Sequence, residues 1–162
     1  MYGPFAPGFR PAPGDKGAFS TNAYIYDVLL HKNGSMNDIP GGAASVPPGT
    51  SVDVRDVAHG LVAALTGPTN IGRKRFMLTG EWFAFKDAAE LIKKSRPELA
   101  DRVTVNSESM LMPFPKTLQD NTRAIELLGL GGVIPWQQTV LDAVDSIIRL
   151  EKEWAQQGII LS

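Results

Sequence analysis

Glycine and proline are concentrated at the start of the sequence, and this limits what the first third of the chain can form. Residues 1–50 hold seven of the twelve prolines and eight of the sixteen glycines. Proline removes a backbone donor and glycine weakens regular elements, so we expect residues 1–50 to be mostly loop. A loop of that length is unusual in a compact domain. Either this part is disordered, or it covers a body that lies outside these residues.

Hydrophobic periodicity predicts several helices. The first interrupts the early loop at about residues 22–32, and residues 33–50 return to loop. The others are expected at residues 54–65, 85–95, 121–128 and 137–155. Asp53 is placed to cap the helix at 54–65, and Asp56 follows it at the spacing of a capping box.

Strands are few in this sequence. Only residues 75–79 and 102–106 have a pattern typical of strands. Two or three short strands do not make a self-sufficient sheet, and amphipathic helices must cover something with their apolar faces. We therefore expect a mostly helical α/β layout with two or three short strands. The chain is then either one part of a larger α/β protein, with an exposed apolar face, or a small independent α+β domain.

Composition excludes several classes of function. The sequence has no cysteine, which excludes a disulfide framework, a zinc ribbon and a thiol nucleophile. With two histidines and no cysteine, we expect no metal site. A net charge of −1 gives no indication of a nucleic-acid or membrane partner. No apolar run approaches the roughly 20 residues needed to cross a bilayer, and the first residues lack the basic region and apolar stretch of a signal peptide, so we expect none. We expect a cytoplasmic protein.

Spacing alone identifies no catalytic group. His31 ends a predicted helix, where a cation offsets the helix dipole, and His59 lies off the apolar stripe of its helix. Asp53 and Asp56 fall in a first helical turn, where carboxylates usually cap rather than exchange protons. The glycine clusters do not follow the Gly-x-Gly-x-x-Gly pattern. The aromatic pair at 82–83 could line a pocket but is better explained as core.

Five segments, in order along the chain, resemble the carboxyl-terminal half of the extended short-chain dehydrogenases/reductases. Residues 2–4 (Tyr-Gly-Pro) are similar to the turn after the last core strand of the nucleotide-binding half, and residues 20–22 to the opening of the next helix. Residues 52–58 (Val-Asp-Val-Arg-Asp-Val-Ala) match most specifically the branch of dihydroflavonol reductases, cinnamoyl-CoA reductases and fungal ketone/aldehyde reductases. Residues 75–81 and 120–130 resemble its Arg-Tyr-x-x-Ser-Gly-Glu and Asp-Asn-Ser-Lys-Ala…Leu-Gly-Leu blocks.

The resemblance implies the substrate-binding lobe of an NAD(P)H-dependent carbonyl reductase. Residues 1–162 would form one lobe, with Gly/Pro-rich loops and one helix in 1–50 and the regular α/β part in 51–162. The implied reaction is hydride transfer from NADPH or NADH to a small ketone or aldehyde, with NADPH the commoner donor in this branch. The implied cofactor contacts are Tyr2, Gly3 and Pro4, and the implied substrate contacts are Phe5, Ser20 and Asn22. Gly3 would let the backbone approach the nicotinamide ring, and Phe5 would add an apolar wall.

The family's catalytic parts are not found in this sequence. In the family, the nucleotide-binding half carries a glycine-rich loop, a catalytic Ser or Thr and a Tyr-x-x-x-Lys pair, whereas no tyrosine here has a lysine four positions later. We therefore expect a chain without the nucleotide-binding domain, with no catalytic residue of its own, that alone neither binds NAD(P)H tightly nor reduces carbonyls. The alternative is a non-catalytic interaction module whose uncovered helix faces bind a partner. The same faces would allow self-association.

Overall fold

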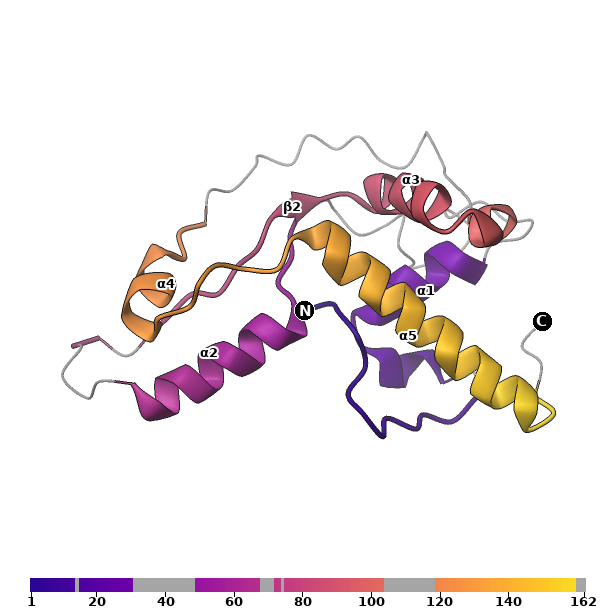
Figure 1. Ribbon diagram of the computed structural model, residues 1–162, viewed down its shortest axis with the longest axis horizontal. Coiled ribbons are helices and arrows are strands. Elements are labelled where there is room, and N and C mark those ends of the chain that lie inside the picture. Colours follow the sequence, from indigo (N-terminus) through magenta and orange to yellow (C-terminus); the bar gives the residue numbers. More distant parts are fainter. Residues whose placement is uncertain (14, 31–48, 68–71, 74, 104–118, 160–162) are drawn as a thin grey trace.

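The structure is a computed structural model that describes residues 1–13, 15–30, 49–67, 72–73, 75–103 and 119–159 (Figure 1). Helices dominate these residues, and the two short strands pair with each other. The elements are η1 (Lys16–Phe19), α1 (Asn22–Leu30), β1 (Gly49–Thr50), α2 (Val54–Thr66), β2 (Trp82–Phe83), α3 (Phe85–Ser95), η4 (Pro97–Arg102), α4 (Thr122–Leu128) and α5 (Trp136–Gln156), where η denotes a 3-10 helix. This confirms the predicted mostly helical fold with short strands.

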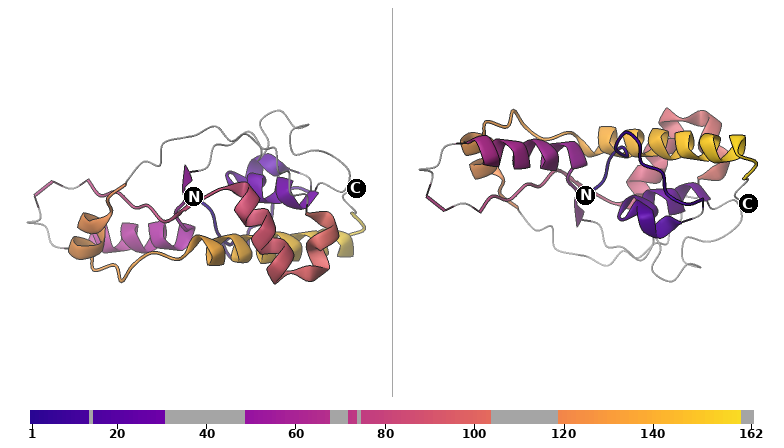
Figure 2. Two further views of the ribbon diagram at one scale, coloured as in Figure 1. Left: turned by 90° about the horizontal axis from the view of Figure 1, so that it is seen from above. Right: turned by 90° about the horizontal axis from the view of Figure 1, so that it is seen from below.

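The elements gather into two groups, on either side of the amino terminus (Figures 1 and 2). In the larger group, α1 and α3 pack on α5, and η1 and η4 close its ends. This group holds the hydrophobic core, to which α1 contributes Ile25, Val28 and Leu29, α3 Ala88, Ala89 and Ile92, and α5 Val140, Val144, Ile147 and Leu150. In the smaller group, α2 packs on α4.

The helices of the larger group form where their apolar residues repeat at helical spacing. In α5 the buried positions recur every three or four residues, from Thr139 to Trp154. In α3 the amide of Ala84 donates to Asp87 at 3.2 Å, and Lys93 and Lys94 lie at the negative end of the helix dipole. The predicted helices at 85–95 and 137–155 are therefore confirmed, the second with one further residue at each end.

The helices of the larger group bury their apolar residues, whereas α2 in the smaller group buries its polar side. Its buried residues are Asp56 and Gly60, whereas Leu61, Val62 and Leu65 are 63%, 61% and 87% exposed. The helix predicted at 54–65 is correct, and the exposed apolar face that we expected lies on it. Among the described residues, no helix is both long and apolar enough to cross a bilayer.

Two predictions about the start of α2 have different outcomes. Asp53 caps the helix as expected, since its Oδ1 accepts a hydrogen bond from the amide of Arg55 at 2.8 Å. The capping-box role of Asp56 is wrong. Its Oδ2 accepts instead from the amide of Ile134 at 2.8 Å, because the loop at residue 134 brings a part-buried donor to it from outside the helix.

The predicted strand at 75–79 is wrong. These residues are irregular, because no described segment pairs with them and the carbonyl of Thr79 accepts from the side chain of Asn121 at 2.8 Å. The strand comes later, at β2, which pairs antiparallel with β1 in the register Gly49 with Phe83. Residues 49–50, expected as loop, are therefore a strand.

The remaining boundaries follow the sequence with small shifts. The helix expected at 22–32 is described as α1 to Leu30, and the following residues, with His31 and the loop at 33–48, lie outside the described residues. The helix expected at 121–128 starts at Thr122 and ends at Leu128, and Gly129, with a φ of 65°, is its left-handed C-cap. Of the strand expected at 102–106, Arg102 ends η4, and residues 104–106 lie outside the described part.

Candidate functional site

An open cavity of about 400 Å³ lies between the amino-terminal segment and the start of α1. It brings together every residue proposed from the sequence for cofactor or substrate, although they come from two separate segments. These lining residues are Tyr2, Gly3, Pro4, Phe5, Ser20 and Asn22. Val54, the first residue of α2, completes the wall. The candidate site is therefore formed where the amino-terminal segment, α1 and α2 meet.

Asn22 holds the turn at Gly3 in place. Its Oδ1 accepts from the amide of Gly3 at 3.3 Å, and its Nδ2 donates to the carbonyl of Gly3 at 2.8 Å. Beside it, the Thr21 hydroxyl donates to the carbonyl of Met1. Asn22 is buried, so both ends of its amide serve the backbone of this turn. Its contribution to the site is to orient the turn.

Gly3 is required by the packing of the protein around it. Its φ is +130°, and a Cβ there would lie 3.0 Å from Cγ1 of Val54 and 3.2 Å from the carboxylate oxygens of Asp53. A side chain would therefore strain the backbone and collide with the protein rather than with a ligand in the cavity. This packing constraint requires glycine at position 3, and the approach of its backbone to a nicotinamide ring stays a prediction.

Asp53 is the buried anchor beneath this turn. Its carboxylate accepts from Nε and Nη2 of Arg55, both at 2.9 Å, and from the Thr139 hydroxyl at 2.7 Å. Arg55 also pairs with Asp142 at 2.7 Å. Burial raises the pKa of Asp53, but hydrogen bonds from Arg55 and Thr139 outweigh it and hold the pKa below its ordinary value. Asp53 therefore stays charged and links α2 to α5.

The amino-terminal segment is attached directly to this anchor. Tyr2 forms a parallel bridge with Asp53, in which the Tyr2 amide donates to the carbonyl of Val52 at 3.0 Å and the Val54 amide donates to the carbonyl of Tyr2 at 2.8 Å. The backbone that lines the cavity thus continues the chain entering α2. The position of the turn depends on the Asp53 network.

Aromatic rings form the apolar wall. Phe5 stacks on Phe9, with ring centroids 4.6 Å apart and an interplanar angle of 25°, and packs against Phe19 at 5.0 Å. Phe19 in turn stacks on Trp154 of α5. The amide of Phe5 donates to Oγ of Ser146 at 3.3 Å. This ties the wall to the core helix.

Tyr2 faces a second aromatic group. Its ring packs edge-on against Phe83 at 5.7 Å and Phe85 at 6.2 Å. Burial, followed by the nearby Tyr24, raises the pKa of Tyr2 to about 12. The phenol is therefore neutral near pH 7 and a weaker acid than an ordinary tyrosine. Phe83 is buried and stacks on Trp136, as the core interpretation of residues 82–83 predicts.

Ser20 has the one strained non-glycine backbone among the described residues. Its φ is 53° and its ψ −132°. Such conformations cost on the order of 1–3 kcal/mol and are concentrated at functional sites. The side chain lines the cavity, is exposed, and forms no hydrogen bond to a described residue. Ser20 thus lines the cavity with a hydroxyl that no described residue engages.

The chain is similar to known reductases in sequence and in fold. No family model matches the sequence. The ketoreductase azaE of Aspergillus niger is 35% identical over 126 residues, which cover 78% of this chain and 36% of azaE. Gre2 of Candida albicans, solved in complex with NADPH, has a TM-score of 0.65 at 24% identity, covering 92% of this chain and 41% of that one. Yeast Gre2, a methylglyoxal/isovaleraldehyde reductase solved with NADPH, has a TM-score of 0.62 at 20% identity, covering 93% and 45%.

The similarity to azaE and to the two Gre2 structures supports the resemblance to the extended short-chain dehydrogenases/reductases. The chain corresponds to the carboxyl-terminal part of such reductases, as the sequence predicted. It spans less than half the length of each of these relatives. The fold is accordingly a partial one, in which five α-helices and two short strands are described.

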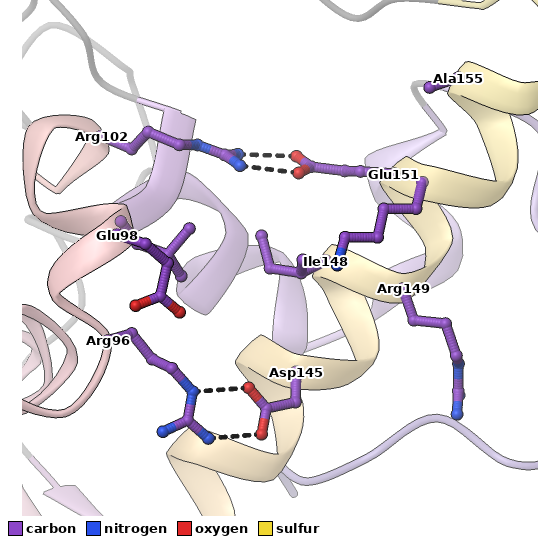
Figure 3. A pocket seen from close by; sticks show the side chains of 10 residues that line it. Arg96, Glu98, Arg102, Asp145, Ile148, Arg149, Glu151 and Ala155 are labelled. Atoms are coloured by element: carbon purple, nitrogen blue, oxygen red, sulfur yellow. Dashed lines mark hydrogen bonds and ion pairs between the residues drawn. The ribbon is translucent and has the colours of Figure 1, made fainter.

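A second, larger cavity of about 780 Å³ lies between η4 and α5 (Figure 3). Two arginines of the η4 segment face carboxylates of α5 across it. Nε and Nη2 of Arg96 donate to the carboxylate of Asp145 at 2.9 and 2.6 Å. Nη1 and Nη2 of Arg102 donate to the carboxylate of Glu151, both at 2.8 Å. These charges are already paired, so the groove functions as a clamp that holds η4 on α5.

The candidate site is supported by residues that the sequence did not single out. Thr139 and Asp142 belong to no sequence motif. Their roles follow only from the contacts of α5 with the start of α2. Arg55 lies in the matched block at residues 52–58. The sequence therefore pointed to Arg55, but its structural role was not predicted. Among the described residues, no group of three His, Asp or Glu side chains could hold a metal ion.

Proposed function

We propose that this chain is the substrate-binding portion of an NADPH-dependent carbonyl reductase, with residues 1–162 acting as one lobe. One observation carries the proposal, namely that the six residues predicted for cofactor and substrate line a single cavity. The relatives support the reaction class, since azaE is a ketoreductase and both Gre2 structures were solved with NADPH.

The composition of the cavity suits a nicotinamide ring and a small ketone or aldehyde. Ligand pockets are mostly apolar with a few polar groups that fix orientation. Here the walls are Pro4, Phe5 and Val54, and the exposed hydroxyl is that of Ser20. When bound, NADPH supplies the hydride that reduces the carbonyl carbon. Phe5 and Val54 exclude water from one side of the cavity.

The six residues then divide into two roles. Tyr2, Gly3 and Pro4 present backbone to the nicotinamide, and Phe5 and Ser20 contact the substrate. Asn22 acts through Gly3, because its amide is already bonded to that residue at both ends. It is a positioning residue on the substrate side of the turn.

We further propose that these 162 residues by themselves are inactive. Tight dinucleotide binding in this family rests on a glycine-rich loop at a helix start, and the sequence has no such loop. Proton delivery needs an acid of suitable pKa, and burial moves the pKa of Tyr2 in the unfavourable direction, to about 12. Fluorescence titration of the purified chain with NADPH, followed by a carbonyl-reduction assay, tests this. Micromolar binding with turnover would contradict it.

The assignment of the site is tested in a chimera. The part of azaE that this chain does not match is fused ahead of residues 1–162, and reduction of a panel of ketones and aldehydes is measured with NADPH. Ser20→Ala should lower kcat/KM at least tenfold while NADPH binding is retained. Ser95→Ala is the matched control, since it makes the same change on α3, away from the cavity. Equal activity in the two variants would remove Ser20 from the site.

A second function is favoured by the exposed side chains of α2. The chain could act as a non-catalytic interaction module that holds a partner through this helix. A stable partner recovered with the chain, in a complex that reduces no carbonyl, would support that alternative. We expect either activity in the cytoplasm, which localisation of a tagged chain would test.

A further inference from the structure

We propose that two buried hydroxyls of α5, those of Thr139 and Ser146, position the two halves of the candidate site independently. Thr139 sets the cofactor side, which is the turn at residues 2–4, and Ser146 sets the substrate side at Phe5. The inference rests on the proposed function, because it concerns the same cavity. It goes further by assigning the placement of each half to one side chain that does not line the cavity.

Thr139 and Ser146 carry the hydroxyl groups among the buried residues of α5. They lie seven positions apart, which is close to two helical turns, so both side chains leave the helix on the same side. A hydroxyl buried in a hydrophobic core is costly unless it is hydrogen-bonded. The presence of both on this face of α5 is therefore explained by the partners that they hold.

Thr139 acts on the cofactor side through Asp53. Its hydroxyl donates to Oδ2 of Asp53 at 2.7 Å, and the carbonyl of Pro135, one turn back, lies 3.2 Å away. A hydroxyl has one hydrogen, so the shorter bond to the charged carboxylate takes it. Both carboxylate oxygens of Asp53 lie beside Gly3, 3.2 Å from the position that a Cβ would take. The carboxylate therefore supports the turn, and Thr139 fixes where the carboxylate lies.

Ser146 acts on the substrate side through the backbone of Phe5. Its hydroxyl donates to the carbonyl of Ala143 at 2.8 Å, inside α5. The hydrogen is used there, so the lone pairs remain to accept the amide of Phe5 at 3.3 Å. The ring of Phe5 forms the aromatic wall, with its centroid 4.6 Å from that of Phe9 and 5.0 Å from that of Phe19. The bond from the Phe5 amide to Ser146 therefore places this wall.

The spacing of the two hydroxyls matches the length of the segment that they hold. From residue 2 to residue 5 an extended chain spans at most about 10 Å, and from Thr139 to Ser146 the helix rises about 10.5 Å. The amino-terminal segment continues along the same helix (Figure 1), since Arg10 pairs with Glu153 at 3.6 Å. Each hydroxyl therefore holds its own end of residues 2–5.

Amide hydrogen exchange in the chain alone tests the two attachments. Ser146→Ala should speed exchange of the Phe5 amide about fivefold, as expected for one lost bond, and leave the amide of Val54, which is bonded to the turn, unchanged. Thr139→Val should do the reverse. Each rate is divided by that of the Val144 amide in the core of α5, so that a general loss of stability cancels. Each variant is the matched control for the other.

Kinetics of the azaE chimera test the two roles. Thr139→Val should raise KM for NADPH about tenfold, because a bond to a charge is lost, with kcat nearly unchanged. Ser146→Ala should change the preference between a bulky aryl ketone and a small aldehyde about fivefold, with KM for NADPH unchanged. Thr139→Ser retains the hydroxyl and should bring KM back toward the parent value. A merely structural role would instead lower kcat/KM for every substrate in both variants alike.

Circular dichroism shows whether each variant is folded. One that is not is replaced by Thr139→Cys or Ser146→Cys, whose thiols bond more weakly than the hydroxyls. The same two effects are then expected, in smaller size.

Each outcome decides the inference. Exchange at Phe5 and Val54 that rises together in both variants, or in neither, would overturn it. A chimera that reduces carbonyls, but in which Thr139→Val and Ser146→Ala shift the same constants, would overturn it and leave the proposed function intact. A parent chimera that reduces no carbonyl would remove the reductase assignment, while the exchange pattern would still decide whether the two hydroxyls position the segment.

Discussion

The hydroxyl of Thr139 donates to the carboxylate of Asp53 at 2.7 Å, across 86 residues of sequence. Both residues are buried, and this bond joins the long helix α5 to the start of α2. The turn that lines the candidate site is attached to the same carboxylate through Tyr2. The stability of the site therefore depends on a contact outside the cavity.

Thr139→Val should destabilise the chain. The change keeps the shape of the side chain but removes a hydrogen bond to a buried charge, which costs about 1–3 kcal/mol of unfolding free energy. Thr139→Ser, which retains the hydroxyl, is the control and should lose less. Urea denaturation followed by circular dichroism measures both. Equal stability of the valine and serine variants would show that the bond contributes nothing.

Asp53 should make stability depend on pH in the acid range. Its pKa in the folded chain is held below the ordinary value of 3.8, so the unfolded state binds the proton more readily. The stabilisation is present in full above about pH 4 and is lost as the pH falls through the folded-state pKa. Asp53→Asn should lower stability at pH 7 and flatten the decline below pH 4.

The measurement is unfolding free energy at several pH values between 2 and 7. Asp101→Asn, which changes an exposed carboxylate of η4, provides the comparison. If Asp53→Asn follows the same acid decline as the parent chain, the carboxylate does not carry this part of the pH dependence.

Gly3→Ala should be more harmful than Gly8→Ala. Both glycines have positive φ, at 130° and 81°, but a Cβ at Gly8 meets nothing within 4 Å. At Gly3 it would crowd Asp53 and Val54. Backbone strain alone costs about 1–3 kcal/mol, and crowding adds to it at Gly3 only. Thermal melting of the two variants separates the contributions, and identical melting temperatures would rule out the crowding.

The two ion pairs across the η4 groove should differ in strength. The side chains of Arg102 and Glu151 are 26% and 19% exposed, whereas those of Arg96 and Asp145 are 30% and 52% exposed. Solvent screens the more exposed pair, so we expect a coupling of about 1 kcal/mol for Arg102–Glu151 and less than about 0.5 kcal/mol for Arg96–Asp145. Double-mutant cycles measure both. A larger coupling for Arg96–Asp145 would reverse this order.

The helices were predictable because their signals are local. Periodicity and capping located the helices at 54–65, 85–95 and 137–155 to within one or two residues of α2, α3 and α5. The prediction of a strand at 75–79 was wrong because strand formation depends on more than the local sequence. An extended pattern becomes a strand only with a partner, and the backbone of Thr79 is bonded to Asn121 instead.

The orientation of α2 could not be predicted from its own residues. The sequence shows which side of the helix is apolar, but the side that faces the protein depends on what is packed there. Asp56 and Gly60 turn inward because Ile134 and Leu78 receive them. The members of the candidate site were found through family resemblance. Their supports Thr139 and Asp142 were not, since a contact across more than 80 residues leaves no local pattern.

The bond from the amide of Phe5 to Ser146 joins residues 141 positions apart. At a translation speed of 5–20 residues per second, a ribosome needs roughly 7–30 s to make the chain between them. During that interval the aromatic residues near the amino terminus have no helix α5 to pack on. The cavity wall is therefore synthesised well before α5 and can be assembled only after α5 has been made, which leaves its phenylalanines open to chaperones during that interval.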